Sequence, residues 1–198
     1  MTLTRMLTAV ELSAYIALGA VALLAANLLL GLLLATGYNP ARHWPYRPIK
    51  LFRFHNWTGY IALGAVLLHP LILLFSSTPR FRVIDLIAPV WSPVQPTSNV
   101  LGAIALYLVV VVVATSYFRR ALGRRLWRTI HYTNYAAATI FFLHGIIADP
   151  TVTGRPVKYL DGEKVFVEGC AVLFVATAMW RIRHRRTQRR LQAERAQG

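Results

Sequence analysis

Cysteine is almost absent from this 198-residue sequence, in which Cys170 stands alone. A single cysteine excludes an intrachain disulfide, a c-type haem attachment motif and the cysteine set of an iron–sulfur cluster. No Gly-x-Gly-x-x-Gly motif occurs either, so nothing in the chain predicts a dinucleotide-binding domain. We therefore expect any haem to be held without covalent bonds, and any nicotinamide to be oxidised by a separate protein.

Long apolar runs are what the sequence has in abundance. Hydrophobic residues make up 56% of the chain and the mean hydropathy is +0.47. A helix needs about twenty apolar residues to cross the roughly 30 Å hydrocarbon core of a membrane. We predict a single all-α domain over residues 1–198, a polytopic membrane helix bundle of about five spans. These are residues 11–36, 55–77, 99–118, 126–148 and 164–180.

Acidic residues are scarce, and the positive charge is sorted by loop. The chain has 7 Asp or Glu against 22 Lys or Arg, and segments 38–54, 119–128 and 181–198 hold sixteen of these basic residues with a single acid. By the positive-inside rule these segments face the cytoplasm, which places the N-terminus outside and the C-terminus inside. This sorting favours topology and lipid contact over nucleic-acid binding. We expect a bacterial inner-membrane protein with a basic cytoplasmic tail at 181–198.

Four histidines lie inside the predicted spans, as two pairs with similar spacing. His55 and His69 occupy the second span, and His131 and His144 occupy the fourth. An ionisable side chain at this depth costs roughly 3 kcal/mol or more unless it is paired or ligated, so a functional role is the default interpretation. Spacings of 14 and 13 residues separate the members of each pair by roughly 20 Å along a helix. One metal ion therefore cannot bind both members of a pair.

Pairing across the two helices is the alternative. The second and fourth spans run in the same direction, so His55 and His131 form an inner pair, and His69 and His144 form an outer pair. Imidazole suits iron, copper, zinc and nickel, but two imidazoles that face each other across a bundle favour the axial positions of a b-type haem. Zinc requires three or four ligands, and no carboxylate or cysteine near these histidines supplies them.

The spacing of thirteen is geometrically awkward. Fourteen residues at about 100° each return to nearly the same helix face, whereas thirteen leave His131 and His144 about 140° apart on an ideal helix. We therefore expect that His144 approaches its haem from another side or that its helix is distorted. Pro70, directly after His69, also predicts a bend near the outer end of the second span.

A wider pattern leads into the second histidine pair. Residues 115–131 read TSYFRRALGRRLWRTIH. With the spacings of 14 and 13, this segment resembles the ferric reductase-like transmembrane domain, a family that includes NADPH oxidases, ferric reductases and the haem-binding membrane subunit of a bacterial methionine sulfoxide reductase system. The resemblance covers about residues 50–182 and implies two stacked b haems with the four histidines as axial ligands. Fuller members carry a flavin and NADPH domain and an additional helix, so we expect a stand-alone membrane domain here.

The predicted function is that of an oxidoreductase that transfers electrons across the membrane. A cytoplasmic flavoprotein, which carries the flavin, or a membrane quinol is the expected donor to the inner haem. The acceptor at the outer face stays open among a ferric chelate, oxygen, quinone and a periplasmic reductase. Two other classes also stay open: a haem-bearing sensor or membrane anchor without turnover, and a histidine-lined proton or metal transporter. Such transport pathways commonly use intramembrane carboxylates beside histidine, and the two spans that carry the histidines contain no Asp or Glu.

Arginines are the expected partners of haem propionates, because a guanidinium pairs with a carboxylate through two hydrogen bonds. The candidates are Arg53, Arg125 and Arg128 on the inner side and Arg80 and Arg82 on the outer side. For each of these arginines, the alternative role is to set the membrane topology or to contact lipid.

Aromatic and small residues near the histidines have two interpretations as well. Large rings can pack on haem faces or fill the bundle, and the candidates are Trp57, Tyr132 and Phe142. Glycines can let a flat ligand or a neighbouring helix come close, and the candidates are Gly59, Gly64 and Gly102. Within the long outer loop, residues 81–87 can lie along the membrane interface as a short amphipathic piece.

Overall fold

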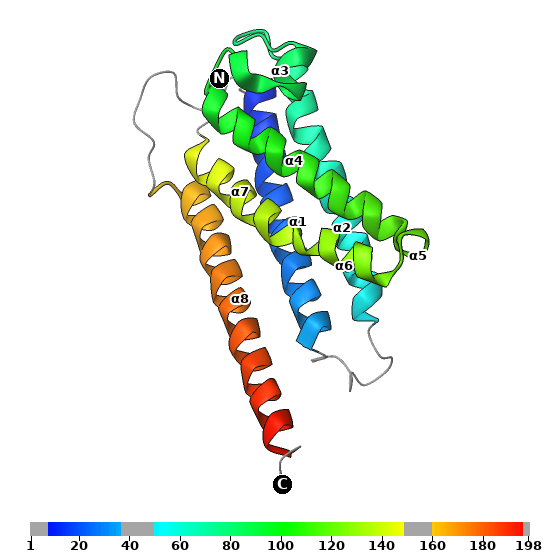
Figure 1. The fold of residues 1–198 in the computed structure, drawn as a ribbon. Coiled ribbons are helices and arrows are strands. Elements are labelled where there is room, and N and C mark those ends of the chain that lie inside the picture. The colour runs from blue at the N-terminus through cyan, green and yellow to red at the C-terminus, as the bar shows by residue number, and fades with distance from the viewer. Residues whose placement is uncertain (1–7, 37–49, 149–159, 196–198) are drawn as a thin grey trace.

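The computed structural model describes residues 8–36, 50–148 and 160–195, and the regular secondary structure in these ranges is entirely helical. Its long helices are α1 (Ala9–Thr36), α2 (Leu51–Ile72), α4 (Pro96–Tyr117) and α8 (Gly162–Arg195) (Figure 1). All four are long and apolar enough to cross a membrane, α2 together with the 3-10 turn η1 (Leu73–Phe75). The chain is an integral membrane protein with an all-α fold, as its apolar runs predict.

The predicted fourth span is two helices rather than one continuous helix. A short helix, α5 (Arg119–Leu122), leads into α6 (Arg124–Tyr132), and α7 (Asn134–Ile147) follows after Thr133. The backbone N–H and the hydroxyl of Thr133 both donate to the carbonyl of Ile130, three residues earlier. A hydroxyl that bonds back to the preceding turn bends a helix. The distortion that the spacing of thirteen requires therefore lies between the two histidines of that span. Among the described residues, four helical segments are long and apolar enough to cross a membrane, against the five spans predicted.

The last helix continues well beyond the predicted span of 164–180. α8 is 34 residues long, or about 50 Å at 1.5 Å per residue, and it stays helical through the basic tail as far as Arg195. Arg and Gln are good helix formers, so the helix does not need apolar residues to continue. In Figure 1 the C-terminal part of α8 extends past the ends of its neighbours.

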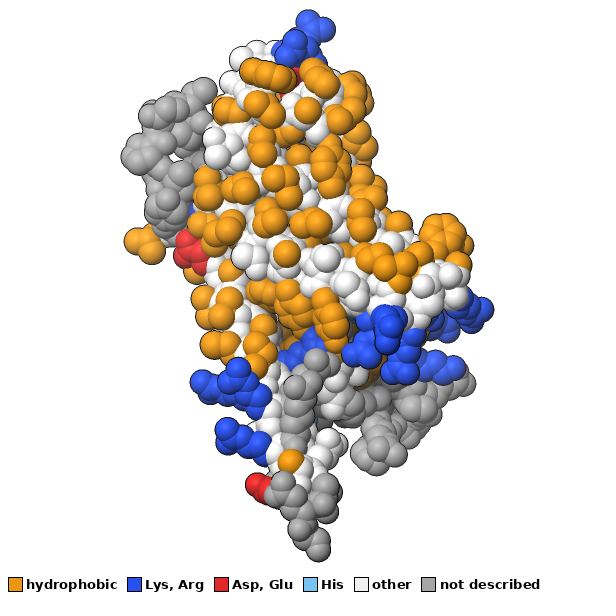
Figure 2. Space-filling view, viewed as in Figure 1, with side chains coloured by type: hydrophobic (Ala, Val, Ile, Leu, Met, Phe, Trp, Pro, Cys, Tyr) orange, Lys and Arg blue, Asp and Glu red, His pale blue; other side chains and the backbone are white. Residues whose placement is uncertain are grey.

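The long helices pack mainly in two pairs, and α8 packs on one helix of each pair. α1 packs along α2, α4 packs along α7, and α8 packs on α1 and α7. A small core from α1, α7 and α8 joins Val21, Ala138, Phe142 and Val167. Most large apolar side chains instead face outward, where hydrocarbon is the natural solvent. Figure 2 shows hydrophobic side chains over most of the visible face, with Lys and Arg gathered at the end where α5, α6 and the last part of α8 lie.

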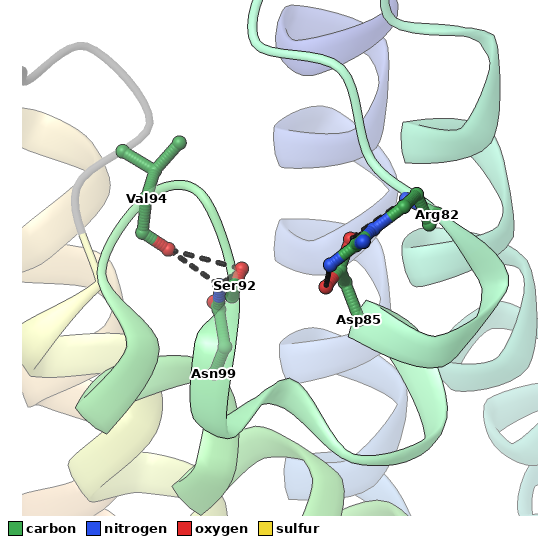
Figure 3. Close-up of polar contacts among 5 residues, drawn as sticks. All are labelled: Arg82, Asp85, Ser92, Val94 and Asn99. Carbon is green, nitrogen blue, oxygen red and sulfur yellow. Dashed lines mark hydrogen bonds and ion pairs between the residues drawn. The ribbon is translucent and has the colours of Figure 1, made fainter.

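The outer loop between α2 and α4 is ordered by polar contacts (Figure 3). Arg82 binds Asp85 through a salt bridge of 3.2 Å, and the Asp85 carboxylate also accepts the backbone N–H of Arg82 at 2.9 Å. These contacts fix the start of α3 (Val83–Ile87), which is followed by the 3-10 turn η2 (Pro89–Trp91). Asn99 Nδ2 donates to the carbonyl of Val94 and to Ser92 Oγ, both at 2.8 Å. That this loop lies along the membrane interface stays a prediction.

Candidate functional site

The inner histidine pair brings together two helices that are far apart in the sequence. The rings of His55 on α2 and His131 on α6 have centroids 6.3 Å apart, and their planes are inclined at 81°. Metal–imidazole bonds are about 2.0–2.1 Å long, so two imidazoles that bind one ion from opposite sides have ring centres about 6 Å apart. The separation observed here fits this arrangement.

The outer pair lies at the other end of the second and fourth predicted spans. His69 is close to the end of α2 and His144 is close to the end of α7. The side chains of His144 and His69 are close enough to interact electrostatically. The structure therefore brings both side chains to one end of the bundle. Within the described ranges, no three His, Cys, Asp or Glu residues gather in a group that could hold a metal ion. Each pair therefore offers two ligands, as the axial positions of a haem need.

Both outer histidines are held in the same way by a serine of the preceding long helix. Nδ1 of His69 lies 2.9 Å from the backbone oxygen of Ser13 and 2.9 Å from its hydroxyl. Nδ1 of His144 lies 2.7 Å from the backbone oxygen of Ser98 and 3.2 Å from its hydroxyl. Ser13 also donates its hydroxyl to the backbone oxygen of His69 at 2.8 Å. α1 thus orients a side chain of α2, and α4 orients a side chain of α7.

The inner histidines are held by the same two helices. Nδ1 of His55 lies 3.1 Å from the backbone oxygen of Asn27 on α1, whose amide donates to the backbone oxygen of His55 at 2.5 Å. Nδ1 of His131 lies 3.3 Å from the hydroxyl of Ser116 on α4. The same hydroxyl accepts the indole N–H of Trp127, whose ring stacks on His131 at a centroid distance of 5.1 Å.

These contacts decide which ring nitrogen can bind a metal. A carbonyl oxygen only accepts, so Nδ1 carries the proton in His55, His69 and His144. Their Nε2 atoms then keep the lone pair that ligation requires. Histidines that bind metals usually donate their other N–H to a carbonyl or carboxylate in this way. His131 differs, because the hydroxyl of Ser116 can donate or accept.

A cavity of about 400 Å³ opens beside the inner pair, between α1, α6 and α8. Ligand pockets commonly have volumes of about 300–1,000 Å³. Four guanidinium groups line this cavity, those of Arg119, Arg124, Arg128 and Arg181. A smaller cavity of about 60 Å³ lies beside the same two histidines and is lined in part by Val109 and Val112. The pair thus stands between a cationic and a largely apolar space, which fits a flat ligand with carboxylates at one edge.

The predicted arginines are placed differently from one another. Arg128 lines the inner cavity and donates to the hydroxyl of Tyr132 at 3.3 Å. Arg53 and Arg125 are exposed and do not belong to the cavity lining. On the outer side, Arg80 is exposed and the guanidinium of Arg82 is engaged with Asp85. Contact of any of these arginines with a propionate stays a prediction.

The three aromatic residues predicted near the haems lie in different parts of the structure. Tyr132 lines the inner cavity. Trp57 is 59% exposed and faces away from the bundle, and Phe142 belongs to the apolar core. Packing on a haem face is therefore supported for Tyr132 alone among the three.

Glycines make room for two of the imidazole rings. A Cβ atom on Gly102 would lie 2.8 Å from Cε1 of His144, closer than real contacts allow. A Cβ atom on Gly31 would lie 3.1 Å from Cε1 of His55. Gly59 instead faces the amide of Asn27, and Gly64 has nothing within 4 Å. The close approach expected at Gly102 is thus to an imidazole, whereas no protein atom comes close to Gly64 and a role beside a flat ligand stays a prediction there.

Sequence reasoning missed several residues of this site, and some of them carry a local signal. Arg124, Trp127 and His131 are spaced as i, i+3 and i+7 on α6, so helical periodicity places them on one face. The same periodicity favours Arg124 over Arg125. Ser13 and Ser98 carry no such signal, because 56 and 46 residues separate them from the histidines that they hold.

Comparison with known proteins places the chain in a family. The sequence model described as "Ferric reductase like transmembrane component" matches residues 11–142. The match covers two thirds of the chain and includes α1 as well as three of the four histidines. A search of curated proteins and a search of solved structures found no match.

Proposed function

The chain belongs to the family of ferric reductase-like transmembrane components, and from that premise we propose that it carries electrons across the membrane through two b-type haems. His55 and His131 are the axial ligands of the inner haem. His69 and His144 are those of the outer haem. Membership of the family assigns the chain to membrane oxidoreductases in general; the two haems, their ligands and the direction of transfer are our proposal.

The geometry of the inner pair carries this proposal. The ring separation of 6.3 Å suits one metal ion between the rings. Nδ1 of His55 is engaged by a backbone oxygen, which leaves Nε2 available for a ligand, and His55 lines the cavity. A structural histidine needs neither a facing imidazole at this distance nor a cavity beside it. When bound, a b-type haem supplies a one-electron redox centre.

The chain's own residues orient and hold the ligand. The carbonyls of Ser13, Asn27 and Ser98 fix the ring planes and keep Nε2 free of a proton. Arg124, Arg128 and Arg181 supply positive charge to the carboxylate edge of the inner ligand, since guanidinium groups bind carboxylates strongly. Val109 and Val112 offer apolar contact on the opposite edge.

The two sites define a path with a cytoplasmic entrance. Roughly 20 Å of α2 separates His55 from His69, and His131 lies on α6, which is at the end where Lys and Arg gather (Figure 2). A cytoplasmic flavin reductase or a membrane quinol donates to the inner site, and an acceptor at the outer face receives the electron. Basic residues of α5, α6 and α8 would speed the approach of an acidic reductase.

Haem content of purified protein tests the proposal. The wild type, expressed with sufficient haem, should show a Soret band and dithionite-reducible α and β bands, with about two haems per chain. His69→Ala should lose about half of the haem, because the outer site alone is broken. His184→Ala is the matched control, since His184 lies on α8, stacks on Trp180 and lines neither cavity. A colourless wild type, or an unchanged haem ratio in His69→Ala, would contradict the proposal.

Electron flux separates a carrier from a sensor or an anchor. Sealed vesicles of known orientation should reduce an impermeant acceptor on the outer side when a reduced flavin system is present at the cytoplasmic side. The His69→Ala variant should lose this flux and keep a reducible inner haem. Haem reduction without transmembrane flux in the wild type would favour a sensor.

A further inference from the structure

The C-terminal end of α7 presents a local problem, because the last four carbonyls of a helix have no partners within it. In a membrane protein such groups must be satisfied by the protein itself. The backbone N–H of Ala148 bonds to the carbonyl of His144 at 2.8 Å. The carbonyls of Gly145, Ile146 and Ala148 need partners from elsewhere.

One side chain of α8 supplies these partners. Lys164 is 7% exposed, and its ammonium donates to the carbonyls of Gly145 at 3.0 Å, Ile146 at 2.9 Å and Ala148. An ammonium group has three N–H donors, and here three carbonyls of one helix end accept them. A cation at a helix C-terminus also interacts favourably with the helix dipole.

An apolar side chain in the next turn of α8 packs against the same C-terminal end of α7. Val167 is 4% exposed, and its Cγ1 lies 3.0 Å from the position that a Cβ atom on Gly145 would occupy. Gly145 follows His144 directly in the chain. The first two turns of α8 thus hold the backbone next to an outer histidine from two sides, by hydrogen bonds and by van der Waals contact.

We propose that Lys164 is a positioning residue of the outer site, which fixes the last turn of α7 and through it the imidazole of His144. This inference rests on the proposed function for its link to haem. The ring of His144 has little freedom to adapt, because Gly102 lies against one side and the carbonyl of Ser98 binds Nδ1. A small tilt of the last turn changes both contacts. The outer ligand is therefore sensitive to Lys164, and the inner pair, roughly 20 Å away along the helix, is not.

Hydrogen exchange of the haem-free full-length protein in nanodiscs tests the structural step. Lys164→Met should increase the exchange of the Ile147 and Ala148 amides about tenfold or more, because hydrogen bonds from a charged donor are lost. Amides of α2 should exchange as in the wild type. Glu163→Gln, an exposed neighbour in the same turn, is the control and should leave the exchange unchanged. Equal exchange in Lys164→Met and the wild type would overturn the proposal.

Low-spin haem signals in electron paramagnetic resonance test the functional step. Lys164→Met should shift or broaden the outer haem signal and change its midpoint potential, with the inner signal unchanged. Lys164→Arg, which keeps the charge and the N–H donors, should restore the wild-type outer signal. Equal changes at both haems, or no rescue by arginine, would show general destabilisation and would overturn the positioning role.

The two steps fail in distinguishable ways. If the wild type binds no haem, the proposed function fails while the exchange result still decides whether Lys164 holds α7. If the wild type binds two haems and Lys164→Met leaves both signals unchanged, the positioning role fails alone. Should Lys164→Met not fold, Lys164→Gln, which keeps two donors, allows the same comparison.

Discussion

Each candidate ligand is oriented by a residue of another helix. His55 and His69 on α2 are held from α1, and His131 and His144 are held from α4. A backbone oxygen is the acceptor for three of these rings, and a backbone position is difficult to change by substitution. The hydroxyl of Ser116 is the exception, and the inner site therefore has one ring whose proton position is less constrained.

Gly102 gives the sharpest prediction at this scale. Gly102→Ala should eliminate or distort the outer haem, because the new Cβ atom would lie 2.8 Å from Cε1 and 3.0 Å from Nε2 of His144. The inner haem should be retained. The effect does not come from helix propensity, since alanine favours a helix by about 1 kcal/mol over glycine. Haem per protein and the low-spin resonance signals measure the result.

Gly169→Ala is the matched control for that substitution. Gly169 also lies inside a long helix, α8, but nothing is within 4 Å of its Cβ position and it lines neither cavity. This variant should keep both haems and both signals. Two normal haems in Gly102→Ala would show that the ring of His144 is not confined as the structure indicates.

At the scale of secondary-structure elements, two features are informative: the break between α6 and α7, and the short loop helix α3. The break at Thr133 divides the predicted fourth span into α6, which carries His131, and α7, which carries His144, and this change of direction accounts for the awkward spacing. α3 is only five residues long, so it depends on contacts outside itself. The Arg82–Asp85 pair supplies them at one end, and the hydroxyl of Tyr107 donates to the carbonyl of Ile87 at the other.

The ordering of α3 should depend on pH. Hydrogen bonds from Arg82, with its charge, hold the pKa of the Asp85 carboxyl below its ordinary value. The contribution of this pair is present above the unfolded pKa, about 4, and is lost as the pH falls through the lower folded value. A nitroxide at Ile87→Cys, in a Cys170→Ala background, should therefore become more mobile when the pH is lowered from 6 through that folded value.

Asp85→Asn provides the comparison for that titration. Without the carboxylate, the label should already be mobile at pH 6 and should not respond to acid. An immobile label at every pH in the parent protein would show that the Arg82–Asp85 pair does not order α3.

For the whole molecule, the charge distribution leads to a testable orientation. We expect the end with α5, α6 and the last part of α8 to face the cytoplasm. In a Cys170→Ala background, Arg80→Cys should react with an impermeant maleimide in intact cells, because Arg80 is exposed in the outer loop. Arg190→Cys, exposed on α8, should react only in inverted vesicles. The opposite pattern would reverse the proposed direction of electron flow.

The sequence by itself determined the membrane class, the family and the two pairs of histidines. These follow from local properties: apolar runs long enough to span hydrocarbon, basic residues sorted by loop, and spacings along one helix. Burial energetics in a bilayer are strong enough to be visible in composition. The limits of the first and third helices also agree with the apolar runs to within three residues.

Only the tertiary structure decided what holds those histidines. Ser13, Ser98 and Lys164 act across 56, 46 and 19 residues of chain, and no local periodicity connects such positions. Arg181 reaches the inner cavity because α8 packs beside α1 and α7. In the sequence it is only the first residue of the basic segment 181–198, which the positive-inside rule explains. Packing of helices against one another sets these contacts, and that information belongs to the fold as a whole.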